Sequence, residues 1–164
     1  QYETPSTLGM DRVCSAVGAL EIATKKNIIS HDQFLITIDL GTATTINIVS
    51  PDKQFIGGLI APGINTMLNS LNDETAQLPL PKAGSYKGLI GSSTNSSIMS
   101  GVITSTIGLI NESVNYLYRE SKHFPLVFAT GGNAKIIIPY LKHQLIYEES
   151  LVLRGLKVIY DLNN

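Results

Sequence analysis

The chain has 164 residues, enough for one ordinary domain with its own apolar core. Apolar residues make up 43% of it and charged residues only 15%, against about 25% in an average soluble domain. The 12 basic and 13 acidic residues form no basic block, so nucleic acid is not an expected partner. The shortage of charge predicts that a second lobe or a second copy covers part of the surface.

The cysteine content and the hydropathy indicate a cytoplasmic protein. Cys14 is the only cysteine, which excludes an intramolecular disulfide and is typical of a reducing compartment. Its apolar neighbours predict a small buried residue on a helix. No run approaches the roughly 18 apolar residues of a membrane span, and we recognise no signal peptide. Because the chain opens at Gln1 without a methionine, we expect a fragment of a longer protein.

The first half of the chain predicts one helix followed by three adjoining strands. The helix covers 11–26, and short turns separate strand-like runs over 33–39, 44–49 and 54–60. Such short connections imply an antiparallel meander, with a glycine bulge in the third strand.

The second half predicts helices around two further strands. A helix opens at Pro62 and Gly63, and the prolines and glycine of 78–86 predict a surface loop. The remaining predicted elements are a long helix over 94–120, a buried strand over 126–129, a helix ending near 140, a strand near 144–147 and a helix over 150–160. This order predicts a single α/β domain over 1–164, with a mixed sheet flanked by helices.

The strongest local signal is the run Asp-Leu-Gly-Thr-Ala-Thr-Thr at 39–45. A glycine turn followed by threonines supplies N–H and O–H donors for phosphate oxygens. A carboxylate beside phosphate requires a cation between them, so Asp39 at the end of its strand suggests a metal ion. The alternative is a β-hairpin whose Asp and Thr side chains only satisfy the hydrogen bonds of the turn.

A second glycine turn, Thr-Gly-Gly-Asn-Ala at 130–134, lies between a buried strand and a helix. Glycines let a ligand approach the backbone, and a helix N-terminus favours an anion or a polar nucleotide edge. Many such turns bind nothing. Because this turn and the one at 39–45 both follow apolar strands, we expect both to open at one edge of the sheet.

The stretch Gly-Met-Asp-Arg at 9–12 starts the first helix and allows two interpretations. Asp11 is either an N-cap or a general base that takes a proton from a substrate hydroxyl. Arg12 could clamp a carboxylate or a phosphate through its planar fork.

Other polar residues give weaker signals. The run Gly-Ser-Ser-Thr at 91–94 either binds a polar ligand or forms a serine-rich N-cap of the long helix. His31, His123 and His143 lack metal-ligand spacing, and we assign them no role. We find no Ser–His–Asp arrangement that would indicate covalent catalysis.

In this order, the motifs resemble those of the type III pantothenate kinases. The family pattern is matched by Tyr2 and Pro5, and by the stretches at 9–12, 39–45, 57–63, 70–71, 75–76, 78–79, 100–101 and 130–134. The match spans nearly the whole chain, and the combined order is far more specific than any one piece.

The resemblance implies a ribonuclease-H-like lobe of the actin-like ATPase and sugar kinase superfamily, in which two lobes bracket ATP. It implies phosphorylation of pantothenate to 4′-phosphopantothenate, the first step of coenzyme A biosynthesis. ATP, Mg²⁺ and a monovalent cation, K⁺ or NH₄⁺, are the implied cofactors. The implied assembly is a homodimer whose pantothenate site lies at the subunit interface.

The resemblance also implies roles for individual residues. Asp11 is the implied catalytic base, and Asp39 the implied ligand of the monovalent cation. The implied pantothenate contacts are Tyr2, Gly9, Met10, Arg12 and Thr94. The implied nucleotide contacts are Gly41, Thr42 and Thr44 on the phosphates, with Gly131 and Gly132 on the adenosine side.

Three departures from the family pattern qualify this expectation. The Asp-x-Gly-Asn-Thr phosphate loop of the first lobe has no counterpart, so we expect the chain alone to lack kinase activity. Asn47 stands where the family usually has Asp, and Ser93 where it usually has Asn. The alternatives are a regulatory or accessory protein of the same fold, and a kinase of the superfamily with another small-molecule acceptor.

Overall fold

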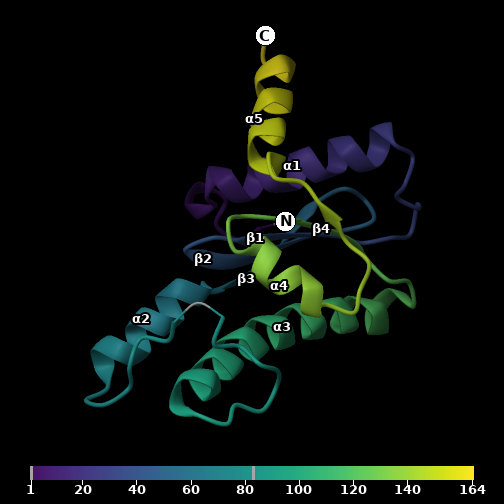
Figure 1. Cartoon of the computed structure of the whole chain (residues 1–164). Helices are drawn as coiled ribbons and strands as arrows, with labels where there is room; N and C mark the ends of the chain where they lie inside the picture. Colours follow the sequence, from purple (N-terminus) through teal and green to yellow (C-terminus); the bar gives the residue numbers. More distant parts are fainter. Residues whose placement is uncertain (1, 83) are drawn as a thin grey trace.

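In the computed structural model of the chain, which describes residues 2–82 and 84–164, a five-stranded mixed sheet forms the centre (Figure 1). Its strands are β1 (Leu35–Leu40), β2 (Ala43–Val49), β3 (Phe55–Pro62), β4 (Leu126–Thr130) and β5 (Ile146–Tyr147), in the order β3-β2-β1-β4-β5. The first three strands form the predicted antiparallel meander, and β4 and β5 add in parallel. The predicted mixed α/β sheet is confirmed.

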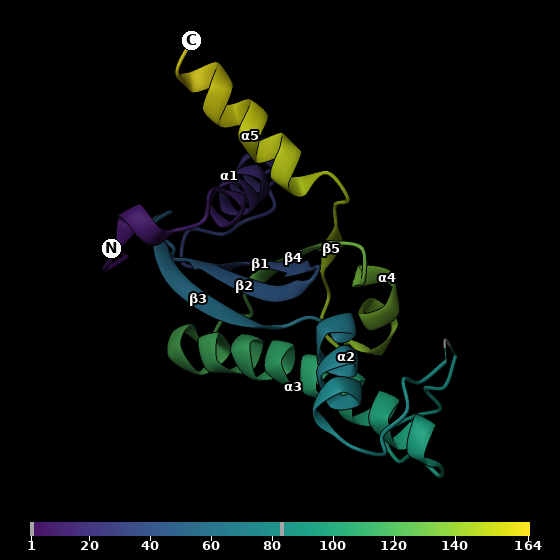
Figure 2. The ribbon, with the colours of Figure 1, turned by 90° about the vertical axis from the view of Figure 1, so that its left-hand side faces the viewer.

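Helices cover both faces of this sheet. They are α1 (Met10–Lys25), α2 (Ile64–Glu74), α3 (Thr94–Ser121), α4 (Ala134–Ile137) and α5 (Leu151–Leu162), with 3-10 turns at Pro5–Thr7 and Ile138–Tyr140. Figure 2 shows α1 on one face with α5 packed over it, and α3 on the opposite face. No helix in the described residues is long and apolar enough to cross a membrane.

The two faces of β1 contribute to two separate cores. Leu35 packs in the cluster beneath α1, whereas Ile36, Ile38 and Leu40 pack in the larger cluster beneath α3. Because helices cover both faces, nearly every residue of β1 is buried, as its continuous apolar run predicts. Asp39 belongs to the α1 face, since side chains alternate along a strand.

Two glycines allow α1 and α5 to cross in close contact. A Cβ on Gly155 would overlap the carbonyl oxygen of Cys14, and one on Gly18 would overlap that of Leu151. Cys14 is buried at this crossing, which confirms its predicted burial.

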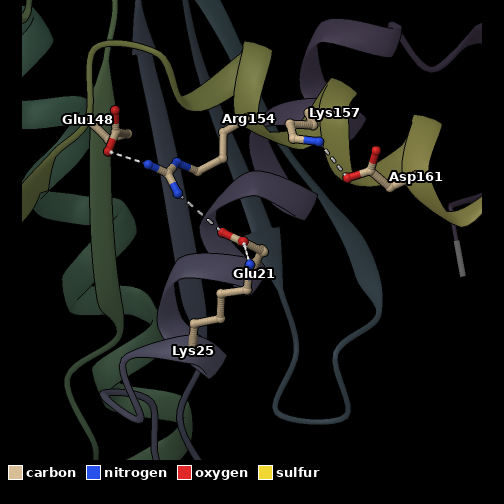
Figure 3. Close-up of polar contacts among 6 residues, drawn as sticks. All are labelled: Glu21, Lys25, Glu148, Arg154, Lys157 and Asp161. Atoms are coloured by element: carbon tan, nitrogen blue, oxygen red, sulfur yellow. Dashed lines mark hydrogen bonds and ion pairs between the residues drawn. The ribbon is translucent and has the colours of Figure 1, made fainter.

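A chain of ion pairs lies beside the crossing (Figure 3). Glu21 of α1 pairs with Lys25 at 2.5 Å and with Arg154 of α5 at 3.5 Å. Arg154 also reaches Glu148, 3.8 Å away, just after β5. The pairs therefore connect α1, α5 and the segment after β5.

The structure differs in detail from two predicted elements and agrees with a third. The predicted helix ending near 140 is one turn of α-helix, followed by a 3-10 turn that contains Pro139. The predicted bulge in β3 is present, but its extra residue is Ile56 and not a glycine, and it lies between the pairs Ile48–Gly57 and Val49–Phe55. The predicted loop over 78–86 contains no helix or strand in its described residues, and residue 83 lies outside them.

Candidate active site

Two glycine-containing loops meet at the carboxyl ends of β1 and β4. These strands are parallel neighbours, with Asp39 directly opposite Thr130. Asn133 joins the loops, because its backbone N–H donates to the Leu40 carbonyl at 2.9 Å and its side-chain amide to the Gly41 carbonyl at 3.1 Å. The predicted convergence of the two loops at one sheet edge is confirmed.

Asp39 is a half-buried carboxylate between these loops. Gly131 has a φ of +94°, and a Cβ there would lie 2.5 Å from the Asp39 Oδ1 atom, so this position requires glycine. Burial raises the pKa of Asp39 above its ordinary value, and the nearby charge of Asp11 raises it further. The ionised form of Asp39 is therefore disfavoured unless positive charge approaches it.

A cation could supply that positive charge. Among the described residues, no group of three or more His, Cys, Asp or Glu side chains is arranged to hold a metal ion. A divalent site made only of side chains is therefore not supported.

Asp11 lies in the first turn of α1 and is exposed. The N-cap of α1 is Gly9, and no side chain caps the helix, so the interpretation of Asp11 as an N-cap is wrong. The charge of Asp11 contributes to the raised pKa values of both Asp39 and Cys14, which places its carboxylate near both residues. Asp11 and Asp39 therefore form an acidic pair with one exposed and one half-buried member.

Arg12 follows Asp11 but points into the protein, with 6% of its surface exposed. Its Nε donates to the Asn47 side-chain oxygen at 2.6 Å, and the guanidinium carbon lies 5.9 Å from the Tyr2 ring centroid and 5.5 Å from that of Phe55. No carboxylate of the described residues lies within 4.0 Å of its nitrogens. Arg12 is thus a nearly buried cation without an acidic partner.

The threonines of the 39–45 run point in different directions. Thr42 is exposed, and its carbonyl accepts hydrogen bonds from Gly63 N at 2.8 Å and from Thr66 Oγ1 at 2.7 Å. Thr44 is only 1% exposed, its hydroxyl has no hydrogen-bond partner, and it lies on the α3 side of the sheet. Thr45 pairs directly with Asp39 across the strands and shares its face.

Thr45 is therefore the threonine of β2 that lies beside Asp39 on the same face of the sheet. The sequence analysis did not single out Thr45. The period-two alternation of β2 is the signal that could have identified it. Thr44 would then have been assigned to the other face, together with Ile46.

Thr94 is the first residue of α3, on the face of the sheet opposite α1 (Figure 2). Ser93 is the N-cap and forms a capping box with Ser96, which confirms the N-cap interpretation of the run at 91–94. Within one copy, the structure brings Tyr2, Gly9, Met10, Asp11 and Arg12 together on the α1 side and leaves Thr94 on the other side.

Solved structures with similar folds identify the fold of the chain. The chain matches a non-polymerisable pCBH ParM mutant with a TM-score of 0.55 and 15% identity, covering 90% of this chain and 52% of that one. It also matches a structure described as a conserved putative Baf family transcriptional activator from Campylobacter jejuni, with a TM-score of 0.60, 23% identity and coverage of 97% and 66%. The fold is that of an actin-like ATPase lobe.

Sequence comparison identifies the family. The family model for type III pantothenate kinase matches residues 1–116. The chain is 35% identical over 162 residues to the type III pantothenate kinase of Pelobacter propionicus and 34% identical over 163 residues to that of Geobacter sulfurreducens, covering 99% of this chain in both cases. The chain belongs to the type III pantothenate kinase family, and it spans 61% of the length of these relatives.

Proposed function

We propose that the protein containing this chain transfers a phosphoryl group from ATP to pantothenate, giving 4′-phosphopantothenate for coenzyme A biosynthesis. The observation that carries the proposal is the meeting of the two glycine loops around Asp39, on the same face of the sheet as α1, whose first turn carries Asp11 and Arg12. Phosphoryl transfer depends mainly on positioning and on neutralisation of charge, which these groups are suited to provide. The chain alone is proposed to be inactive, because a further lobe would complete the ATP site.

On the acceptor side, Asp11 is the proposed general base. Its carboxylate is exposed at the start of α1, where it can accept the proton of an acceptor hydroxyl. Arg12 would bind the carboxylate of pantothenate through its terminal nitrogens, beside Tyr2. Gly9 and Met10 complete the proposed acceptor surface.

On the nucleotide side, the two joined loops would contact ATP. Gly41 and Thr42 are proposed to approach the phosphates, and Gly131 and Gly132 the adenosine side. Thr44 would contribute through its backbone, since its hydroxyl is buried on the other face. A monovalent cation, K⁺ or NH₄⁺, beside Asp39 would offset the charge of the acidic pair, and Mg²⁺ would be carried by the ATP phosphates.

The proposed assembly is a homodimer in the cytoplasm. Thr94 begins α3, on the face of the sheet opposite α1, so Thr94 does not complete the acceptor site of its own copy. A groove of about 630 Å³ between α2 and α3 lies beside exposed Leu89 and Ile90, so one face carries both a hollow and a protrusion. Such a face can pair with itself in a two-fold dimer. A low cysteine content, here Cys14 alone, is typical of proteins in a reducing compartment such as the cytoplasm.

The test is ADP release by the protein from the complete reading frame, with ATP and Mg²⁺, with and without pantothenate, in potassium and then in sodium. We expect release that depends on pantothenate and on potassium, and none from the 164-residue chain alone. Release without pantothenate dependence, from folded protein, would contradict the proposal and favour a kinase with another acceptor. No release at all would favour a regulatory protein of the same fold.

A further inference from the structure

The turn between β1 and β2 is held through its carbonyl groups. The Thr42 carbonyl accepts two hydrogen bonds, from Gly63 N–H at 2.8 Å and from Thr66 Oγ1 at 2.7 Å. The Gly41 carbonyl accepts one, from the side-chain amide of Asn133 at 3.1 Å, and has no second donor in the part of the chain that the structure describes. The orientation of the Gly41 carbonyl therefore depends on the Asn133 side chain.

The Gly41 carbonyl belongs to the same peptide bond as the Thr42 N–H. In a planar trans peptide the C=O and the N–H point in opposite directions, so the Thr42 N–H points away from Asn133. This N–H makes no hydrogen bond within the described residues, and Thr42 is exposed. It is a backbone donor that an incoming acceptor can reach.

Asn133 makes two contacts with this turn, and they have different consequences. Its backbone N–H donates to the Leu40 carbonyl at 2.9 Å, a bond that any residue except proline could make at this position. That bond keeps the two glycine loops adjacent. The side-chain amide adds the hold on the Gly41 carbonyl, and without it the peptide beside a glycine is free to rotate. The side chain therefore fixes the direction of the Thr42 N–H.

We propose that Asn133 is a positioning residue for the nucleotide. By holding the Gly41 carbonyl, its amide aims the Thr42 N–H at a phosphate oxygen of ATP. It acts through the Gly41–Thr42 peptide and needs no contact of its own with the nucleotide. Asn133 thus makes the loop proposed for adenosine set the geometry of the loop proposed for the phosphates. This inference rests on the proposed function, since it concerns the same nucleotide site.

The first test is Asn133→Ala in the full-length protein, which removes the side-chain donor and leaves the backbone bond to Leu40. We expect Kd for MgATP, measured by titration calorimetry, and KM for ATP to rise about tenfold, as for one weakened hydrogen bond to a charged group. KM for pantothenate should stay within about twofold, because the acceptor side does not depend on this peptide. Asn115→Ala, on the exposed surface of α3, is the control and should change none of these constants.

Asn133→Asp separates the donor from the shape of the residue. The aspartate side chain has nearly the shape of asparagine, but its carboxylate cannot donate to the Gly41 carbonyl and repels the phosphates. We expect the rise in Kd for MgATP to be at least as large as for Asn133→Ala. A residue that only filled space would tolerate this change.

The outcomes separate this inference from the proposed function. If Asn133→Ala binds MgATP as wild type does, or raises KM for ATP and for pantothenate equally, the inference is wrong. If the folded wild-type protein binds MgATP but does not phosphorylate pantothenate, the proposed function is wrong, and the calorimetric comparison still decides the role of Asn133. A folded wild-type protein that binds no MgATP would contradict both. A selective loss of ATP affinity in both variants supports the inference.

Discussion

Asp11 and Asp39 place two carboxylates near each other on the α1 face of the sheet, but in different surroundings. Asp39 is half-buried and has a raised pKa, for which burial is the larger cause and the charge of Asp11 the smaller. Asp11 is exposed in the first turn of α1. The exposed member is the better placed to take a proton, and the half-buried member the better placed to hold a cation.

Asp11→Asn in the full-length protein should lower kcat about 100-fold or more while KM for pantothenate changes only a few-fold. The amide keeps the shape but cannot accept the proton from the acceptor hydroxyl. Steady-state kinetics check this, with Asp52→Asn in the exposed β2–β3 turn as the control that should behave like wild type. Undiminished turnover of Asp11→Asn would remove Asp11 from the role of base.

At the scale of single residues, the sequence patterns predicted correctly which loops meet. They predicted less well where individual side chains point. Apolar strands followed by glycine turns were sufficient to predict that 39–45 and 130–134 share an edge. The directions of Thr44 and Thr45 depend on the exact start of β2, and a shift of one residue exchanges the two faces. The partner of Arg12 was also beyond prediction, because Asn47 is 35 residues away in the chain and meets Arg12 only through the packing of α1 on β2.

At the scale of secondary-structure elements, α1 and α5 can cross in close contact only because Gly18 and Gly155 have no side chains. Gly155→Ala would place a methyl group against the Cys14 carbonyl, which belongs to helical backbone and cannot move aside. We expect a loss of about 2–3 kcal/mol in the free energy of unfolding, the upper part of the range for overpacking. Chemical denaturation of the 164-residue chain measures it.

The matched control is Gly108→Ala in the middle of α3, where a Cβ would meet no atom within 4 Å of it. There the alanine should stabilise the chain by about 0.5–1 kcal/mol, because glycine is unfavourable inside a helix. A Gly155→Ala chain as stable as wild type would show that α1 and α5 can separate without loss.

Glu21 should make the free energy of unfolding depend on pH in the acid range, through its ion pairs at the contact of α1 and α5. Its hydrogen bond with Lys25 lowers the pKa of Glu21 despite its burial, and the charges of Lys25 and Arg154 lower it further. Because the folded-state pKa lies below the ordinary value of 4.5, the stabilisation is present above that value and is lost as the pH falls through the folded-state pKa. Glu21→Gln should therefore cost about 1 kcal/mol at pH 7.

Urea denaturation at a series of pH values tests this, since the difference between Glu21→Gln and wild type should disappear well below pH 4.5. Glu112→Gln is the control, because its pair with Arg119 lies on the exposed surface of α3 and should contribute little at any pH. A constant difference at every pH would mean that Glu21 acts by packing and not by its charge.

For the molecule as a whole, the low content of charged residues predicts a partly covered surface, and the structure has two exposed apolar surfaces that are candidates for such cover. One is the outer side of α5, where Leu153, Leu156 and Tyr160 are exposed. The other is the α2–α3 face, with its groove and the exposed Leu89 and Ile90. Composition could predict that such surfaces exist, but their positions follow from which helix faces the sheet leaves uncovered.

Of the two surfaces, the α2–α3 face carries both a protruding apolar segment and a groove, so it can be complementary to itself in a two-fold interface. Ile90 is 83% exposed, and hydrogen bonds from Ser97 to the Gly91 carbonyl and from Ser100 to the Gly88 carbonyl hold its loop against α3. If the proposed dimer forms through this face, Ile90→Glu should convert the full-length protein to a monomer, because a buried, unpaired carboxylate opposes association. Size-exclusion chromatography with light scattering measures the mass.

Leu153→Glu on α5, where the native side chain is 67% exposed, is the control and should leave the dimer intact. A dimer that survives Ile90→Glu but dissociates with Leu153→Glu would instead assign the interface to α5.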